Sequence, residues 1–350
     1  MVHRPPVWVV ATAGVAIVAV VAVVALRAGD PHEARGNAAG AIEPATPSST
    51  SPTAQGVGSG ATTAPVTNAV DHPGEYAVDE TELTITDPEQ DDRTVDIEVW
   101  YPHTGAPFPL VVFAHGFGTS PDNYADFLGG LASSGHVVAA PRSFTTQAFR
   151  AQEADPPADQ PPGDEPAPEP GAAGDGFDFN GQRLDLVAAI DVLLGPDAPE
   201  DLRGKVASTK VTAIGHSDGG VTAAALSFNS LAGDPRVGSG VIISGDYGEF
   251  GGQWFPDGSP ALLAIHGDSD GVNPVASSVG LYDADGGGPR YLVVVHGAGH
   301  LDLLTDDPPL SFVIALITDF IATYVSNDAS GISRLRSDTD GNVLEMAGAG

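Results

Sequence analysis

The stretch KVTAIGHSDGGVTAAALS, residues 210–227, decides the fold. Its first half is a short apolar run typical of a buried strand, and its second half is typical of a helix. Between the two halves stands Ser217, flanked by Gly215 and Gly219. A serine in this place is exposed only by a sharp turn, and the glycines allow it because a Cβ at either position would collide with neighbouring backbone. We therefore predict a strand–turn–helix with an exposed serine hydroxyl.

The same alternation of strand and helix continues on both sides of this stretch. Apolar runs rich in β-branched residues are PLVVFAHG, HVVAAP, GVIIS, ALLAIHG and RYLVVVHG, and a helical pattern is NGQRLDLVAAIDVLL. Continuous apolar strands alternating with helices predict an α/β fold with a mostly parallel central sheet and helices on both faces. The earlier runs ELTITD and VDIEVWYP alternate apolar and polar residues, which predicts antiparallel strands at the N-terminal edge of the sheet.

Composition divides the chain into a folded domain and flanking segments. Residues 73–326 carry the alternating pattern and are long enough for one domain with a sizeable core. Residues 28–72, rich in Ala, Thr, Pro and Ser, predict a disordered linker, and residues 155–176 form an acidic, proline-rich insert within the domain. This insert is interpreted as a solvated excursion, with a mobile flap over the site as an alternative hypothesis. Residues 327–350 are polar and lack periodicity, which predicts a disordered tail.

Residues 1–27 contain an apolar run without a charge, from Val7 to Leu26. This run is just long enough to cross a bilayer core of roughly 30 Å. An uncleaved signal anchor is favoured over a cleaved signal peptide, because the nearest cleavage-site candidate, Leu26-Arg27-Ala28, is poor. We expect the rest of the chain to be extracytoplasmic, either anchored to the membrane by residues 7–26 or secreted.

The overall composition excludes several classes of function. Among 350 residues, 46 are acidic and 14 are Lys or Arg, which gives a formal net charge of -32 and disfavours binding to nucleic acid. The chain contains no cysteine, so a disulfide, a thiolate metal site and a cysteine nucleophile are all excluded. The acidic residues are scattered and no paired histidines stand at ligand spacing, so no metal site is predicted. The oligomeric state is not indicated.

A serine hydroxyl is a weak nucleophile until a base takes its proton, so the pattern around Ser217 calls for a histidine. His300, in VVVHGAGHLDLL, follows the last apolar strand and should lie at the carboxyl edge of the sheet, where the serine turn also opens. We predict His300 as the base. His296 is the alternative, although its position within or at the end of the strand favours a packing role.

The imidazole also needs a carboxylate to hold its tautomer and stabilise its charged form. Asp270 follows the strand ALLAIHG at the loop depth usual for an orienting acid, and we predict it in this role. Asp246, after GVIIS, and Asp268, which suits a turn-capping role, are the alternatives. The order Ser, Asp, His is the one expected for this fold.

A tetrahedral oxyanion would need backbone donors close to the serine. We predict the N–H of Asp218, directly after the nucleophile, as one donor. The second should be the N–H of Phe117 in the loop HGFG, because the glycines of this loop let its backbone approach an ester carbonyl. A plain strand-exit turn is the alternative interpretation of HGFG.

Together these motifs resemble the α/β-hydrolase superfamily, and within it the group of dienelactone hydrolases, platelet-activating-factor acetylhydrolases and cutinase-type polyester hydrolases. The similarity runs from about Tyr76 to Tyr324 and rests on VWYP, PLVVFAHGFG, FLGGLASSGHVVAAP, GHSDGG, HGDSDGVNP and HGAGH. It implies hydrolysis through an acyl-enzyme without a cofactor. Two departures are the acidic residue after the nucleophile, where relatives usually carry a neutral side chain, and the lack of the disulfide common in secreted cutinase-type relatives.

The predicted function is cleavage of a carboxylic ester, of a small molecule or a polymer, with a short acyl, lipid or polyester substrate. Two alternatives stay open: a peptidase or other acyl hydrolase of the same fold, and a non-catalytic surface or binding protein on a hydrolase scaffold. Against the first alternative, the sequence shows no accessory domain that would select peptides. The second is favoured only by the acidic residue after the nucleophile, Asp218.

Overall fold

The computed structural model describes residues 74–87, 93–105, 107–143, 177–196, 198–207, 209–284, 287–337 and 343–347. The predicted signal segment (1–27), the linker (28–72) and the acidic insert (155–176) lie outside the described residues. Within the described ranges, no helix is both long enough and apolar enough to span a membrane.

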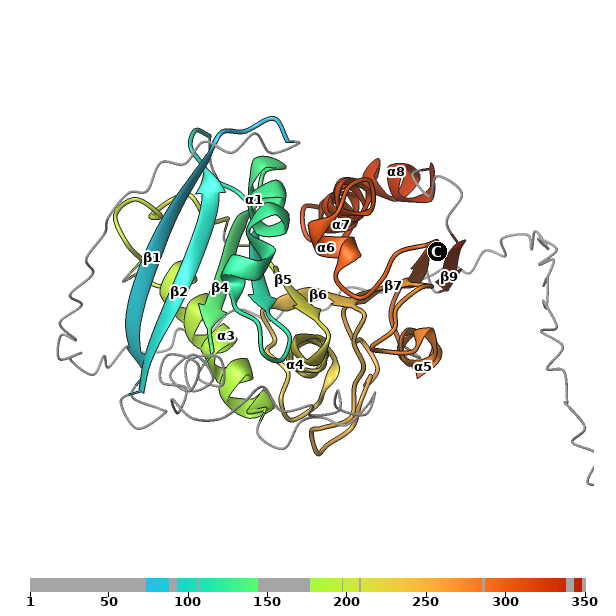
Figure 1. Ribbon diagram of the computed structural model, residues 1–350. Helices are drawn as coiled ribbons and strands as arrows, with labels where there is room; N and C mark the ends of the chain where they lie inside the picture. Colours follow the sequence, from blue (N-terminus) through green and yellow to red (C-terminus); the bar gives the residue numbers. More distant parts are fainter. Residues whose placement is uncertain are drawn as a thin grey trace, which may run out of the picture. The chain divides into compact units, whose positions relative to one another are not determined.

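One sheet dominates the described part of the chain (Figure 1). Its strands are β1 (Val78–Asp87), β2 (Arg93–Pro102), β3 (Leu110–Ala114), β4 (Val137–Arg142), β5 (Val211–His216), β6 (Val237–Ile243), β7 (Ala261–Gly267), β8 (Arg290–Val295) and β9 (Val343–Ala347). They lie in the order β1-β2-β4-β3-β5-β6-β7-β8-β9. Strands β3 to β8 are mutually parallel. Strands β1 and β2 pair antiparallel at the N-terminal edge, as predicted.

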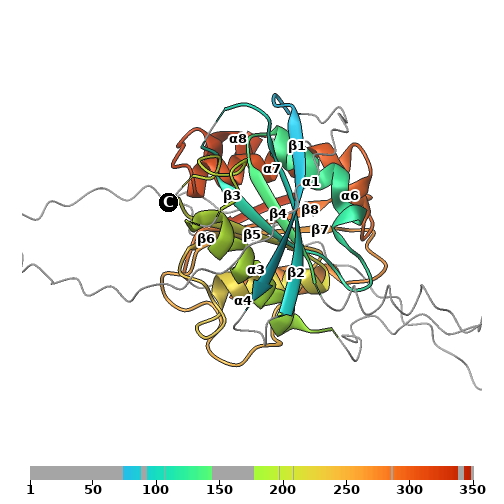
Figure 2. The ribbon, with the colours of Figure 1, turned by 90° about the vertical axis from the view of Figure 1, so that its left-hand side faces the viewer.

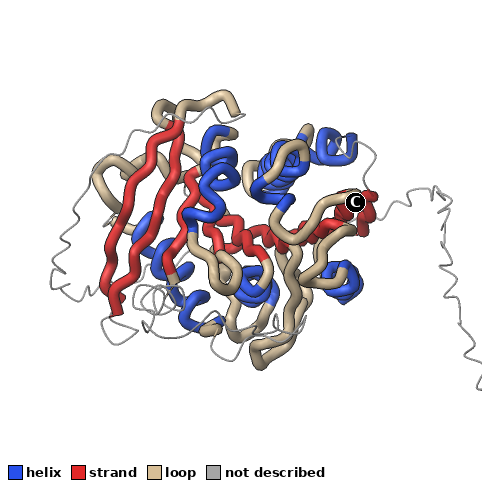
Figure 3. The backbone as a smooth tube through the Cα atoms, viewed as in Figure 1, coloured by secondary structure: helices blue, strands red, loops and turns tan. Residues whose placement is uncertain are grey.

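Helices cover both faces of the sheet, as Figures 2 and 3 show. On one face lie α1 (Ala125–Ser133), α6 (Asp302–Thr305), α7 (Pro309–Tyr324) and α8 (Gly331–Ser337). On the other lie α3 (Phe179–Leu194), α4 (Asp218–Phe228) and α5 (Val275–Ala284). A short 3-10 helix, η2 (Pro121–Tyr124), leads into α1. The predicted fold class is confirmed: this is the α/β-hydrolase fold.

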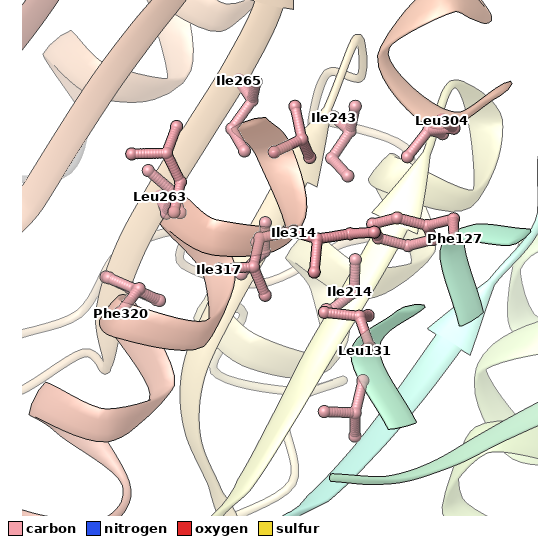
Figure 4. Packing of buried hydrophobic residues seen from close by; sticks show 14 of the residues in the cluster. Phe127, Leu131, Ile214, Ile243, Leu263, Ile265, Leu304, Ile314, Ile317 and Phe320 are labelled. Atoms are coloured by element: carbon pink, nitrogen blue, oxygen red, sulfur yellow. The ribbon is translucent and has the colours of Figure 1, made fainter. Parts of the chain in front are cut away.

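The two faces of the sheet form two hydrophobic cores, because successive strand residues point to opposite sides. In β3, Val111 and Phe113 join the core under α1 and α7, whereas Val112 joins the core under α3 and α4. Figure 4 shows the first core, where Phe127 of α1 and Ile314 of α7 lie near the strands. Burying each such side chain contributes roughly 1.5–3 kcal/mol, which explains why the parallel strands read as continuous apolar runs.

The prediction of a disordered tail over residues 327–350 is wrong for two segments. Helix α8 packs against α7 with Leu335 fully buried, and Arg334 pairs with Asp319 of α7. Strand β9 pairs antiparallel with β8 at the edge of the sheet opposite β1. Both elements are too short to show a period in the sequence, and each depends on a distant partner for its stability.

Candidate active site

The carboxyl ends of the parallel strands bring together the loops that carry the predicted site. Residue 217 follows β5, residues 115–120 follow β3, residues 268–274 follow β7, and residues 296–301 follow β8. Loops at this edge form the usual ligand site of an open α/β sheet.

Ser217 occupies a strained turn between β5 and α4. Its backbone has φ 55° and ψ -124°, which is sparsely populated for a residue with a side chain. A Cβ on Gly215 would lie 2.0 Å from the carbonyl oxygen of Gly219, and one on Gly219 would lie 2.2 Å from that of Ala114. The predicted strand–turn–helix is therefore confirmed. A side chain at Gly215 or Gly219 would collide with backbone, as expected from the sequence.

Asp270 and His300 form a close pair beside this turn. His300 Nδ1 lies 2.7 Å from Asp270 Oδ2, so the ring donates its Nδ1 proton to the carboxylate and leaves Nε2 for another partner. The side chain of Asp270 is fully buried, and that of His300 is 14% exposed. Asp270 Oδ1 accepts hydrogen bonds from the amides of Val272 and Asn273 at 2.8 and 2.9 Å.

The carboxylate of Asp270 is held in its charged form. Burial raises its pKa, but hydrogen bonds from His266, His300 and the two amides outweigh burial and hold the pKa well below its usual range. The result is a permanently charged acceptor for the imidazole of His300 at neutral pH.

His266 is a member of this cluster that the sequence analysis did not single out. Its Nε2 lies 3.3 Å from Asp270 Oδ2 and 3.1 Å from the carbonyl of Asn273, and its Nδ1 lies 2.7 Å from Ser278 Oγ. Two histidines thus contact one carboxylate oxygen, His266 from the end of β7 and His300 from the loop after β8. The only signal in the sequence was a histidine at the end of ALLAIHG, four residues before the predicted acid.

The alternative acids and base make other contacts. Asp268 pairs with His296 at 2.8 Å and accepts the amide of Gly297, and this pair is exposed. Asp246 is exposed and accepts the amide of its own neighbour, Tyr247. Among the predicted acids and bases, Asp270 and His300 therefore form the buried pair.

The loop after β3 runs directly against the serine turn. A Cβ on Gly116 would lie 3.1 Å from the Cβ of Ser217, so only glycine fits comfortably there. Phe117 follows this contact, with a side chain that is 47% exposed and a ring 6.3 Å from that of Phe177. The predicted donor residues, Phe117 and Asp218, each follow a residue of this contact between Gly116 and Ser217.

Asp218 begins α4 with its side chain only half-buried. Burial raises the pKa of its carboxyl group, the charge of Glu249 raises it further, and His300 opposes both. The acidic group noted in the sequence therefore lies in the electrostatic range of the predicted base.

Beneath the site, a buried hydrogen-bond chain connects the loops after β3 and β8 through Tyr124 of η2 and His216 of β5. The amide of Gly116 donates to the hydroxyl of Tyr124 at 3.2 Å, and this hydroxyl lies 3.0 Å from His216 Nδ1. His216 Nε2 lies 3.0 Å from the carbonyl oxygen of His300. Burial, followed by the charge of His300, lowers the pKa of His216 to about 3, so its ring is neutral at neutral pH.

Among the described residues, no group of three or more His, Asp or Glu side chains could hold a metal ion.

Comparison with known proteins gives one family match. A model described as chlorophyllase, an ester-hydrolase family of the α/β-hydrolase type, matches residues 66–156. This range holds β1 to β4 and the loop with Gly116 and Phe117, but not Ser217, Asp270 or His300. The comparison with curated proteins gives no significant match. Together with the observed fold, this match confirms the resemblance to the α/β-hydrolase superfamily. It also supports the general class of ester hydrolases.

Proposed function

We propose that this protein is a serine hydrolase that cleaves carboxylic esters through an acyl-enzyme. The observation that carries the proposal is the bond between His300 Nδ1 and a buried, charged Asp270, at the sheet edge where Ser217 lies on a strained turn. The family match supports the ester-hydrolase class independently of these residues, because it ends before them.

In the acylation step, Ser217 Oγ attacks the ester carbonyl carbon and its proton passes to His300 Nε2. Asp270 stays ionised and stabilises the imidazolium, which its lowered pKa favours. The C–O bond of the tetrahedral intermediate breaks, the alcohol leaves with the proton from His300, and the acyl group stays on the serine. A water molecule then gives a proton to His300 Nε2 and attacks the acyl carbon. The bond between this carbon and Ser217 Oγ breaks, the serine takes the proton back from His300, and the acid is released.

The oxyanion of each tetrahedral intermediate requires preorganised donors. The amides of Phe117 and Asp218 are proposed for this role, and losing one such donor typically costs about 2.7–4 kcal/mol of transition-state stabilisation. The carbonyl of Gly116 supports this assignment, because it accepts from Thr119 Oγ1 at 2.7 Å and His115 Nδ1 at 2.9 Å. In a trans peptide the next N–H points the opposite way from that carbonyl, so the Phe117 amide is directed away from these two donors.

The test is hydrolysis of a series of p-nitrophenyl esters, from acetyl to long-chain acyl, by the full chain and its Ser217→Ala variant. We expect the variant to lose activity on the order of 10⁶-fold, as for removal of the nucleophile in other serine hydrolases. Ser227→Ala is a matched control, because this serine lies on the same helix α4 and its hydroxyl has no hydrogen-bond partner among the described residues.

Two results would contradict the proposal. Activity retained by Ser217→Ala would exclude this serine as the nucleophile. No hydrolysis of any ester, with no labelling of the folded protein by a fluorophosphonate, would favour a binding protein on a hydrolase scaffold. The chain-length optimum, if activity is found, measures the size of the acyl site.

A further inference from the structure

We propose that Tyr124 and His216 are positioning residues that form a hydrogen-bonded bridge between the oxyanion loop and the loop of the base. This inference rests on the proposed function. The bridge consists of three bonds: Gly116 N–H to the Tyr124 hydroxyl, that hydroxyl to His216 Nδ1, and His216 Nε2 to the His300 carbonyl. It therefore connects the loops after β3 and β8 through the residue that precedes the serine.

The direction of each bond follows from the groups at its ends. The carbonyl of His300 can only accept, so Nε2 of His216 carries the proton. In a neutral imidazole the other nitrogen is then an acceptor, so the hydroxyl of Tyr124 donates to Nδ1. The same oxygen accepts from the amide of Gly116. One tautomer of His216 thus satisfies all three bonds at once, and its low pKa keeps that neutral tautomer at neutral pH.

Burial gives this bridge its strength. Tyr124 and His216 are each 1% exposed, so water does not compete for their polar atoms. The ring of Tyr124 packs edge-on against Phe113 of β3, with centroids 4.9 Å apart, and the ring of His216 lies 4.6 Å from that of His300. The two side chains are held by packing as well as by hydrogen bonds, as a rigid support for a catalytic site requires.

The consequence concerns the rate rather than substrate binding. The bridge fixes the backbone of Gly116, directly before the proposed oxyanion donor Phe117, and the backbone of His300, the proposed base. Groups that act on the transition state lose about 10²-fold in rate when misplaced by about 1 Å. Loosening the bridge should therefore lower kcat and leave KM nearly unchanged.

The test is Tyr124→Phe in the full chain, which keeps the buried ring and removes only the hydroxyl. We expect kcat on the best p-nitrophenyl ester to fall by about 10- to 100-fold, with KM within about twofold. Tyr291→Phe is the matched control: Tyr291 is fully buried and its hydroxyl bonds Tyr324 at 2.6 Å, in a strand whose opposite end leads to His300. This control should lose thermal stability to a similar degree without losing kcat.

His216 provides a second, independent test. His216→Phe removes both of its bonds, whereas the amide of His216→Gln can donate to the His300 carbonyl and accept from Tyr124. We expect His216→Gln to recover much of the kcat lost in His216→Phe, and the double variant Tyr124→Phe/His216→Phe to be little worse than His216→Phe alone, because the bridge acts as a unit.

The outcomes separate this inference from the proposed function. If Ser217→Ala is inactive while Tyr124→Phe has the kcat of the wild type, the bridge is overturned and the hydrolase stands. An equal loss of kcat in Tyr124→Phe and Tyr291→Phe, or equal losses in His216→Gln and His216→Phe, would also overturn it. If Ser217→Ala keeps full activity, both proposals fail together.

Discussion

Two Asp–His pairs form between the loops after β7 and β8, and they have nearly the same contact distance but differ in burial. In one, His300 Nδ1 lies 2.7 Å from Asp270; in the other, His296 Nδ1 lies 2.8 Å from Asp268. The side chains of the first pair are 14% and 0% exposed, and those of the second are 55% and 38% exposed. Distance alone therefore does not distinguish the proposed catalytic pair from the exposed pair.

The surroundings of the two carboxylates explain the difference. Asp270 accepts from His266, His300 and two amides, and its side chain is fully buried, so its geometry is fixed by four donors. Asp268 also has a lowered pKa, caused first by His296 and then by the amide of Gly297, but solvent and salt screen its interactions. Burial and multiple donors, rather than the contact itself, hold the geometry of the Asp270–His300 pair that is proposed as the acid–base pair.

The largest difference in activity between the two pairs is expected when each imidazole is removed. His300→Ala should lower kcat/KM on the order of 10⁶-fold, because the base and the proton donor are lost together. His296→Ala should change it by less than about twofold, since an exposed pair contributes little. Steady-state kinetics on one ester measures both. Comparable losses of kcat/KM in the two variants would show that both pairs take part in catalysis. A loss confined to His296→Ala would show that His296, and not His300, is the base.

A smaller effect is expected when each carboxylate is neutralised. Asp270→Asn should lower kcat by about 10⁴-fold, because the amide no longer stabilises the imidazolium or the required tautomer. Asp268→Asn should stay within about twofold of the wild type, as surface substitutions usually do. The same assay, extended to Asp246→Asn, tests all three acids considered from the sequence. Near-normal kcat in Asp270→Asn would exclude it as the orienting acid.

The smallest effect concerns stability as a function of pH. The folded pKa of Asp270 lies below its unfolded value of about 3.9, so its stabilising contribution is complete above about pH 5 and is lost progressively as the pH falls below that. The urea midpoint of the wild type should thus decrease more between pH 7 and pH 3 than that of Asp270→Asn. For Asp268→Asn the difference from the wild type should disappear in about 1 M salt, where exposed charges are screened. Equal pH slopes in wild type and Asp270→Asn would refute the buried-charge argument.

Much of the architecture followed from local patterns in the sequence. The stretch around Ser217 predicted its own turn, because the glycine requirement is a steric property of a few adjacent residues. The apolar runs predicted the parallel sheet, and the alternating runs predicted the antiparallel edge of β1 and β2. The short elements α8 and β9 escaped prediction because their stability comes from α7 and β8, far from them in the sequence.

The chain by itself determined the type of residue at each position of the site: a serine on a glycine turn, and Asp and His candidates in the loops that follow. It could rank Asp270 above Asp268 and His300 above His296 only by their depth in the loops. The tertiary structure decided which pairs meet, because it alone sets burial and register between distant loops. It also supplied His266, Tyr124 and His216, whose importance lies in contacts up to 92 residues apart in the chain. Local steric requirements depend on consecutive residues and can be predicted from the sequence. The burial and hydrogen bonds of the site arise only when separate strands bring their ends to one edge of the sheet.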